Sequence, residues 1–150
     1  MLLASAYSTQ GQFDNAIAAY DGALRLDPHN VLAANNLAAL LVDYKGDPRS
    51  LQKAFALSRD FEKEAPHPLF LDTLGWVRFK MGQQEEALRL MKDAVAKSPE
   101  VPMLNYHLGM AYYHSGKTAQ ARVYISKALK SAELFHGRRE AEQILSQLRG

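Results

Sequence analysis

Residues 74–91 read LGWVRFKMGQQEEALRLM, and residues 108–125 read LGMAYYHSGKTAQARVYI. In both stretches leucine and glycine come first, a second glycine follows eight residues after the leucine, and alanine follows thirteen residues after it. Leu74 and Leu108 lie 34 residues apart. A period of this length is typical of stacked helical hairpins, because two helices and a turn occupy about that many residues. The two stretches therefore predict a repeated pair of helices joined at a glycine.

The same pattern extends toward the start of the chain. Leu3 is followed by Ala16 at the same spacing, whereas Leu37 and Ala54 are separated by four additional residues. The additional residues lie in the turn at 44–50, so we expect the second hairpin to be the irregular one. The predicted repeats cover about 1–30, 31–66, 67–101 and 102–135, and we expect them to form one domain over 1–150.

Hydrophobic positions recur at helical spacing throughout, and no alternating run bounded by turns predicts a strand. We expect helices over 2–10, 13–26, 31–44, 50–64, 69–81, 83–97, 102–115, 118–134 and 138–148. The last one carries Ala141, Ile144, Leu145 and Leu148 on one face, with charges opposite. A repeat array needs such a helix to cover its final apolar face, so residues 137–148 predict a capping helix. The predicted fold class is all-α, a solenoid of about four helical hairpins plus this cap.

The four copies resemble the tetratricopeptide repeat (TPR) family over nearly the whole chain. The family has small residues where the two helices of a hairpin approach closely. The matching residues are Ala4, Ala38, Gly75 and Gly109 on the first helices and Ala16, Ala54, Ala87 and Ala121 on the second. Three positions depart from the family pattern: Arg78 replaces an aromatic residue, Ser58 a bulky one and Glu133 a proline. The departures predict an irregular second repeat and a fourth repeat that runs on into another element.

The resemblance implies that the first helix of each hairpin lines an inner groove that binds a partner. The predicted groove residues are Asn35, Asn36, Asp43, Asp72, Trp76, Phe79, Lys80, Tyr106, Met110, Tyr113 and His114. Aromatic side chains dominate binding energetics and methionine adapts to different partners, so we expect this set to bind a protein or peptide segment. The alternative is that Trp76 and Phe79 pack between adjacent hairpins, as most aromatic residues at helical spacing do.

Two other surfaces offer further interpretations. Met1, Leu2 and Leu3 form an apolar edge on the first hairpin, which predicts a homo-oligomer formed through that hairpin. The stretch Lys117–Lys130 is basic and contains no acid, which favours, more weakly, an anionic polysaccharide or a lipid head group. Because the basic residues there are not interleaved with aromatics as a ladder, we expect no nucleic-acid binding.

Composition narrows the function classes. The chain has 150 residues, 47% of them hydrophobic, and a net charge of +2, which is ordinary for a globular protein. The lack of cysteine excludes thiolate catalysis and zinc–thiolate sites. No catalytic or phosphate-loop motif occurs, and His107 and His114 lie two helical turns apart, too far to share a metal ion. We expect a non-enzymatic protein with no catalytic residue, cofactor or metal, and with no membrane span.

Three short segments carry a weaker resemblance within the family. Residues 35–38, 72–76 and 106–109, followed by a short final helix, resemble the last repeats of large bacterial TPR proteins. Some of those act in cell-envelope, exopolysaccharide or protein-sorting assemblies, which implies a self-associating structural scaffold as the alternative function. The chain also begins within an amphipathic pattern, so we expect it to be the C-terminal portion of a longer protein. Parent proteins of that kind are often exported, and the composition is equally compatible with the cytoplasm.

Overall fold

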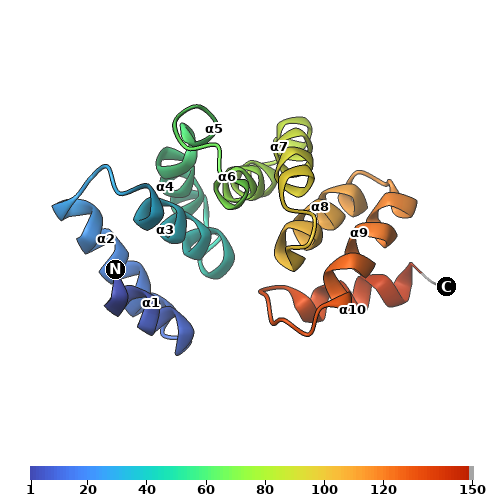
Figure 1. The fold of residues 1–150 in the computed structure, drawn as a ribbon, viewed down its shortest axis with the longest axis horizontal. Coiled ribbons are helices and arrows are strands. Elements are labelled where there is room, and N and C mark those ends of the chain that lie inside the picture. Colours follow the sequence, from blue (N-terminus) through green and yellow to red (C-terminus); the bar gives the residue numbers. More distant parts are fainter. Residues whose placement is uncertain (149–150) are drawn as a thin grey trace. The chain divides into compact units, whose positions relative to one another are not determined.

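The structure, a computed structural model, describes residues 1–148, and these residues form helices and no strand (Figure 1). They divide into two compact units, one spanning Met1–Pro66 and one beginning at His67. The first contains α1 (Leu2–Thr9), α2 (Phe13–Leu26), α3 (Val31–Tyr44), α4 (Pro48–Ser58) and α5 (Phe61–Glu64). The second contains α6 (Pro68–Lys80), α7 (Gln84–Lys97), α8 (Pro102–His114), α9 (Thr118–Lys130) and α10 (Arg138–Gln147). The all-helical repeat fold predicted from the spacing is confirmed.

In the first unit, α1 packs on α2, α2 on α3, and α3 on α4. The residues at these contacts are mostly alanine and leucine, and Ala4, Ala16, Leu37, Ala38 and Ala54 are almost completely buried. Alanine at a helix contact lets two helix axes approach closely, so that leucines from the neighbouring turns fill the space beside it. The repeated leucine and alanine positions in the sequence are thus the core positions of this unit.

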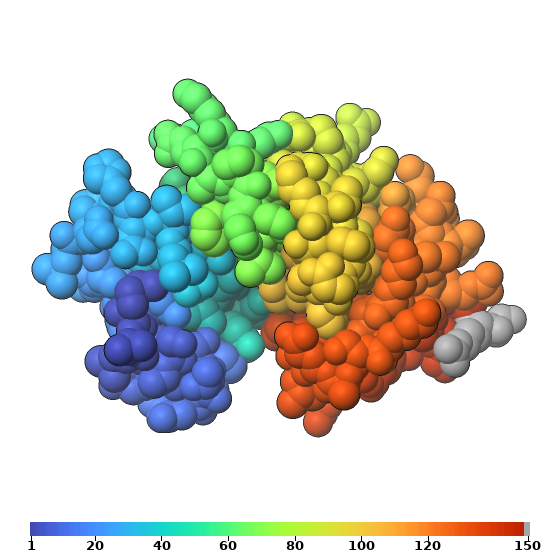
Figure 2. Space-filling view, viewed as in Figure 1, coloured from blue at the N-terminus to red at the C-terminus, as the bar shows by residue number. Residues whose placement is uncertain are grey.

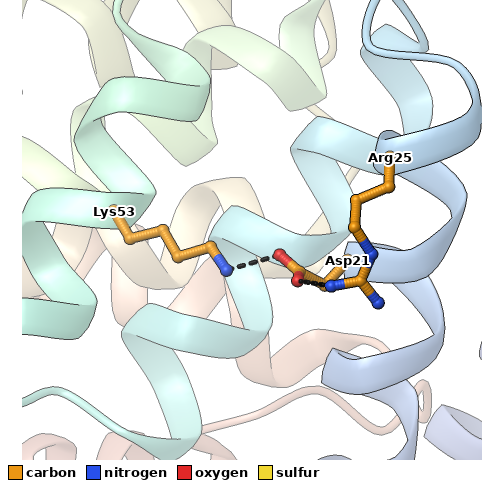
Figure 3. A network of polar contacts seen from close by, with 3 residues as sticks. All are labelled: Asp21, Arg25 and Lys53. Carbon is orange, nitrogen blue, oxygen red and sulfur yellow. Dashed lines mark hydrogen bonds and ion pairs between the residues drawn. The ribbon is translucent and has the colours of Figure 1, made fainter.

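A polar contact on the surface of the first unit joins α2 to α4 (Figure 3). The carboxylate of Asp21 accepts hydrogen bonds from Lys53 Nζ and, at 3.1 Å, from Arg25 Nη1. Arg25 lies one turn along the same helix, whereas Lys53 comes from α4. Since exposed ion pairs contribute at most about 1 kcal/mol each, this network adds little to stability beside the apolar core.

The second hairpin is irregular, as predicted, but its boundaries differ from the expected helix at 50–64. α4 begins earlier, because Pro48 occupies its first turn and the Asp47 carboxylate caps it by accepting from the Arg49 and Ser50 amides at 3.1 Å. The Ser50 hydroxyl, and then these backbone amides, lower the pKa of Asp47. At the other end, α4 stops at Ser58, whose hydroxyl donates to the Ala54 carbonyl, a bond that competes with regular helix geometry. The remainder forms the separate short helix α5.

The second unit has its closest helix contacts at glycine. Each helix from α6 to α10 packs on the next one, and this part of the chain, from green to red, forms a continuous surface in Figure 2. A Cβ atom at Gly109 of α8 would lie 2.7 Å from Ile125 Cγ1 and 3.0 Å from the Ile125 backbone nitrogen in α9. At Gly75 of α6 the nearest atom would be the flexible Met91 Cγ, at 3.0 Å. The predicted close approach therefore exists in both hairpins, and it is tighter and less adjustable at Gly109.

Alanine substitutions at three helical glycines should consequently differ in sign and size. Gly109→Ala should lower the free energy of unfolding by about 1–3 kcal/mol, because a backbone atom stands in the way. Gly75→Ala should cost less, since Met91 can move. Gly22→Ala, where the nearest atom is 3.7 Å from the new Cβ, should stabilise by roughly 0.5–1 kcal/mol through its helix propensity. Urea denaturation followed by circular dichroism measures all three. Equal effects at Gly109 and Gly22 would show that Gly109 is not at a close helix contact.

Candidate functional site

The predicted groove residues of the second unit lie on two adjacent helices, α6 and α8, which contact each other. We call the surface to which they belong the α6–α8 face. Trp76, Tyr106 and Met110 are only 4%, 1% and 2% exposed, and Phe79 is also buried. Tyr113 is half-buried, while Lys80 and His114 are exposed. The structure thus places the predicted set together but leaves mainly its polar end accessible.

The aromatic residues of this face form a packed cluster that we call the aromatic cluster: Trp76, Phe79, Tyr106, His107 and His114. The Trp76 ring stacks on the His107 imidazole at 4.1 Å between centroids and on the Phe79 ring at 5.0 Å. His114 meets the edge of Phe79 at 5.2 Å. Such offset-stacked and edge contacts stabilise beyond the area they bury. Trp76 and Phe79 thus pack between adjacent hairpins, which is the alternative that the sequence left open for them.

A buried polar pair lies beneath the cluster. Asp72 Oδ2 of α6 is 2.7 Å from His107 Nδ1 of α8, and both side chains are almost fully inaccessible. When the carboxylate is ionised it can only accept, and Nδ1 is then the donating nitrogen of the imidazole. Asp72, predicted as a partner contact, is therefore held by its own chain. The pair could have been found from the sequence, because His107 stands one repeat length plus one residue after Asp72.

The helix predicted as a cap covers part of the α6–α8 face. α10 packs on both α8 and α9. Tyr106 donates its hydroxyl hydrogen to Glu140 Oε2 at 2.8 Å, and its ring lies 5.4 Å from that of Phe135. A Cβ atom at Gly137, where φ is +88°, would lie 2.2 Å from the Tyr106 hydroxyl oxygen. The segment between α9 and α10 therefore fits around Tyr106, and α9 ends at Lys130 rather than at the predicted residue 134.

Lys80 is the accessible cation of this face. Its ammonium nitrogen lies 4.5 Å from the centroid of the Trp76 ring, the geometry of a cation–π contact. His114 and Tyr113, which contact each other edge to face, follow on α8. The three side chains offer a positive charge, an imidazole and a phenol hydroxyl next to a rigid aromatic base. This combination suits the carboxylates and backbone carbonyls of a peptide.

The first unit contains the remaining predicted residues, all on α3. Asn35 is buried, while Asn36 and Asp43 are half-buried. Asn36 donates to the Tyr20 hydroxyl of α2 at 3.1 Å, and the Asn35 amide lies 3.4 Å from Asn36 Oδ1. Asn36 thus contributes to the contact between α2 and α3, and Asp43 is the charged residue among these three.

Two other kinds of site do not occur within the described residues. Among residues 1–148, no group of three or more histidine or acidic side chains is arranged to hold a metal ion. In the same range, no helix is both long and apolar enough to cross a bilayer.

Comparison with known proteins agrees with the helix pairs described above. A family model described as TPR repeat matches residues 4–43, and a second, described as tetratricopeptide repeat, matches residues 73–133. The chain belongs to the tetratricopeptide repeat family. TPR domains typically mediate protein–protein interaction, and as a scaffold family they are generally non-enzymatic.

Relatives of this TPR chain share the fold at low sequence identity. The human tetratricopeptide repeat protein 6 is 28% identical over 121 residues, which are 81% of this chain and only 22% of that protein. A TPR protein of Thermus thermophilus superimposes with a TM-score of 0.78 at 19% identity, covering 97% of this chain and 77% of that one. The crystal structure of MamA superimposes with a TM-score of 0.67 at 22% identity, covering 99% and 83%. These similarities show the TPR fold.

The buried Asp72–His107 pair should be energetically coupled. Asp72→Ala or His107→Ala alone should cost about 3–5 kcal/mol, because each breaks a buried pair of polar groups. The double variant should lose less than the sum, by roughly 1–3 kcal/mol. The exposed pair Asp93 and Lys97, 2.6 Å apart on α7, is the matched control and should show coupling below about 0.5 kcal/mol. Urea denaturation of both cycles gives the comparison, and additive losses at Asp72 and His107 would refute the coupling.

Proposed function

We propose that this TPR chain is a non-enzymatic interaction module that binds a segment of a partner protein on the α6–α8 face. The observation that carries the proposal is the position of Lys80 over Trp76, 4.5 Å from the ring centroid, at the accessible end of a buried aromatic cluster. The cluster fixes where the cation stands, and Tyr113 and His114 stand beside it. In the first unit, we propose the half-buried Asn36 and Asp43 as polar contacts of a partner, with the buried Asn35 next to Asn36 as a positioning residue.

The mechanism is recognition by a preorganised polar edge. A side chain that is already held in one place loses little conformational entropy when a partner binds, so more of the contact energy appears as affinity. Lys80 and His114 supply hydrogen-bond donors, and the Tyr113 hydroxyl, which donates to Gln147 Oε1 at 3.4 Å, supplies an acceptor. In this proposal Trp76, Phe79, Tyr106 and Met110 support the face from below, and Asp72 acts through His107.

A site-specific cross-linker tests this surface. With a benzophenone side chain in place of Tyr113, the chain should form a covalent adduct with a protein of a cell extract. The same group in place of Val123, which is 50% exposed on α9, should not form that adduct. The adduct should fall at least about fivefold in yield with Lys80→Ala/His114→Ala, corresponding to roughly 1 kcal/mol of lost contact energy.

The alanine changes touch exposed side chains, so circular dichroism should show an unchanged helix content. An adduct from Val123 of equal yield, or one that persists without Lys80 and His114, would remove the α6–α8 face from consideration.

Self-association is a second candidate function, favoured by one specific observation. Leu2 and Leu3 on α1 are 91% and 62% exposed, and two large neighbouring aliphatic side chains in water favour association with another apolar surface. Binding of a partner segment on the α6–α8 face does not need these side chains. The first candidate function therefore depends on α6 and α8, and self-association depends on α1.

Sedimentation velocity distinguishes the two candidates. If the chain is a scaffold that assembles through α1, it should sediment as a dimer or larger species at micromolar concentration. Leu2→Glu/Leu3→Glu should then restore the monomer, because two charges at the contact oppose association. Leu134→Glu, at a leucine that is 86% exposed outside α1, is the control and should leave the assembly intact. A monomer for the unmodified chain at every concentration would dismiss this second candidate.

A further inference from the structure

A second concave surface of the second unit lies away from the residues assigned above. A cavity of about 340 Å³ is lined by Glu85, Leu88, Arg89, Lys92, Tyr112 and Lys117. The first four are spaced along one face of α7, Tyr112 is near the end of α8, and Lys117 is in the turn before α9. The cavity is thus formed by consecutive hairpins of one compact unit. None of its lining residues belongs to the α6–α8 face.

Leu88 and Tyr112 form an apolar wall of this cavity, and the Tyr112 ring is fixed by stacking. Leu88 is half-buried and Tyr112 is 9% exposed. The Tyr112 ring stacks on that of Tyr124 in α9, with centroids 5.6 Å apart and planes at 21°. Burial, and to a smaller extent Tyr124, raises the pKa of the Tyr112 hydroxyl, so the phenol is neutral at physiological pH. The cavity therefore has room and an apolar wall for one side chain of a ligand.

The rim of the cavity carries positive charge that the chain does not neutralise. Arg89 donates to Glu86 through two nitrogens, at 2.8 and 3.2 Å, so its charge is largely compensated. Lys92 and Lys117, both exposed, form no ion pair within residues 1–148, and Lys117 Nζ lies 5.9 Å from the Tyr112 ring. Glu85 is the one acid among the residues that line the cavity. The basic stretch that ends at Lys130 continues from this rim along α9.

We propose that this cavity binds an acidic segment of a partner protein, with one apolar side chain between Leu88 and Tyr112 and carboxylates at Lys92 and Lys117. The charge of the rim is complementary to such a segment. The apolar wall can bind an apolar side chain of a peptide, whereas an anionic polysaccharide has no apolar side chain to place there. A bilayer is flat on this scale, and Val123 is the single large hydrophobic residue exposed on α7, α8 or α9. The shape and the charge together therefore favour a peptide over a membrane surface.

Nuclear magnetic resonance of the full chain tests the site with a defined probe. The probe is a short, blocked peptide in which one phenylalanine is flanked on each side by glutamates. Its titration should shift the amide signals of residues 85–92, 112 and 117. Lys92→Glu/Lys117→Glu should weaken binding about tenfold, the effect of losing two exposed ion pairs. Arg49→Glu/Lys63→Glu makes the same change of net charge on exposed residues of the first unit and should leave the affinity unchanged.

Two further peptides separate the roles of charge and anchor. Replacing the phenylalanine by alanine, or all glutamates by glutamine, should each abolish the shifts at the probe concentration used. The proposal is overturned if the glutamine peptide binds as tightly, if the shifts map elsewhere, or if both charge-reversed variants behave alike. It is also overturned if heparin or phosphatidylserine vesicles bind at Lys92 and Lys117 more tightly than the peptide does. Since Lys80, Tyr113 and His114 take no part, these results are independent of the α6–α8 face.

Discussion

The close approach of Gly109 to Ile125 sets the separation of two helices in the second unit. A Cβ atom at residue 109 would lie 3.0 Å from the Ile125 backbone nitrogen, and a backbone atom within a helix cannot move aside as a side chain does. α8 and α9 are therefore fixed at the distance that glycine allows. With α8 fixed in this way, its other sides are available to α6 and α10. The Asp72–His107 pair and the hydrogen bond from Tyr106 to Glu140 each depend on that placement.

The regular features of the fold followed from the sequence, because they depend on residue size and spacing. The leucines, small residues and turn glycines identify where helices begin, meet and end, and the helices at 13–26 and 31–44 have the predicted bounds. The break after Ser58, which separates α4 from α5, did not follow from the sequence. The hydrophobic period of that segment continues through the break and gives no sign of it.

The candidate site illustrates a different limit of sequence reasoning. Helical spacing shows which residues share a face, but what covers that face depends on elements far along the chain. Tyr106 has the pattern of an exposed groove residue, yet Phe135 and Glu140, from the segment after α9 and from α10, meet its ring and its hydroxyl. The sequence excluded a metal ion shared by His107 and His114, and the structure gives His107 an aspartate on another hairpin as its partner. The sequence therefore predicted which residues share a helix face, but only the tertiary contacts show which of those side chains are exposed.

Some basic residues of the second unit form ion pairs and others lie over aromatic rings, and the two contacts have different consequences for binding. Lys97 and Arg89 are paired with acids on their own helix, Asp93 and Glu86, so little of their charge is available to a partner. Lys80 and Lys117 instead lie over aromatic rings, and within residues 1–148 neither has a carboxylate partner. An aromatic ring orients a cation without cancelling its charge. The α6–α8 face and the cavity beside α7 therefore each hold a cation of this kind, and so does α9, where Lys127 lies 5.0 Å from the centroid of the Tyr124 ring.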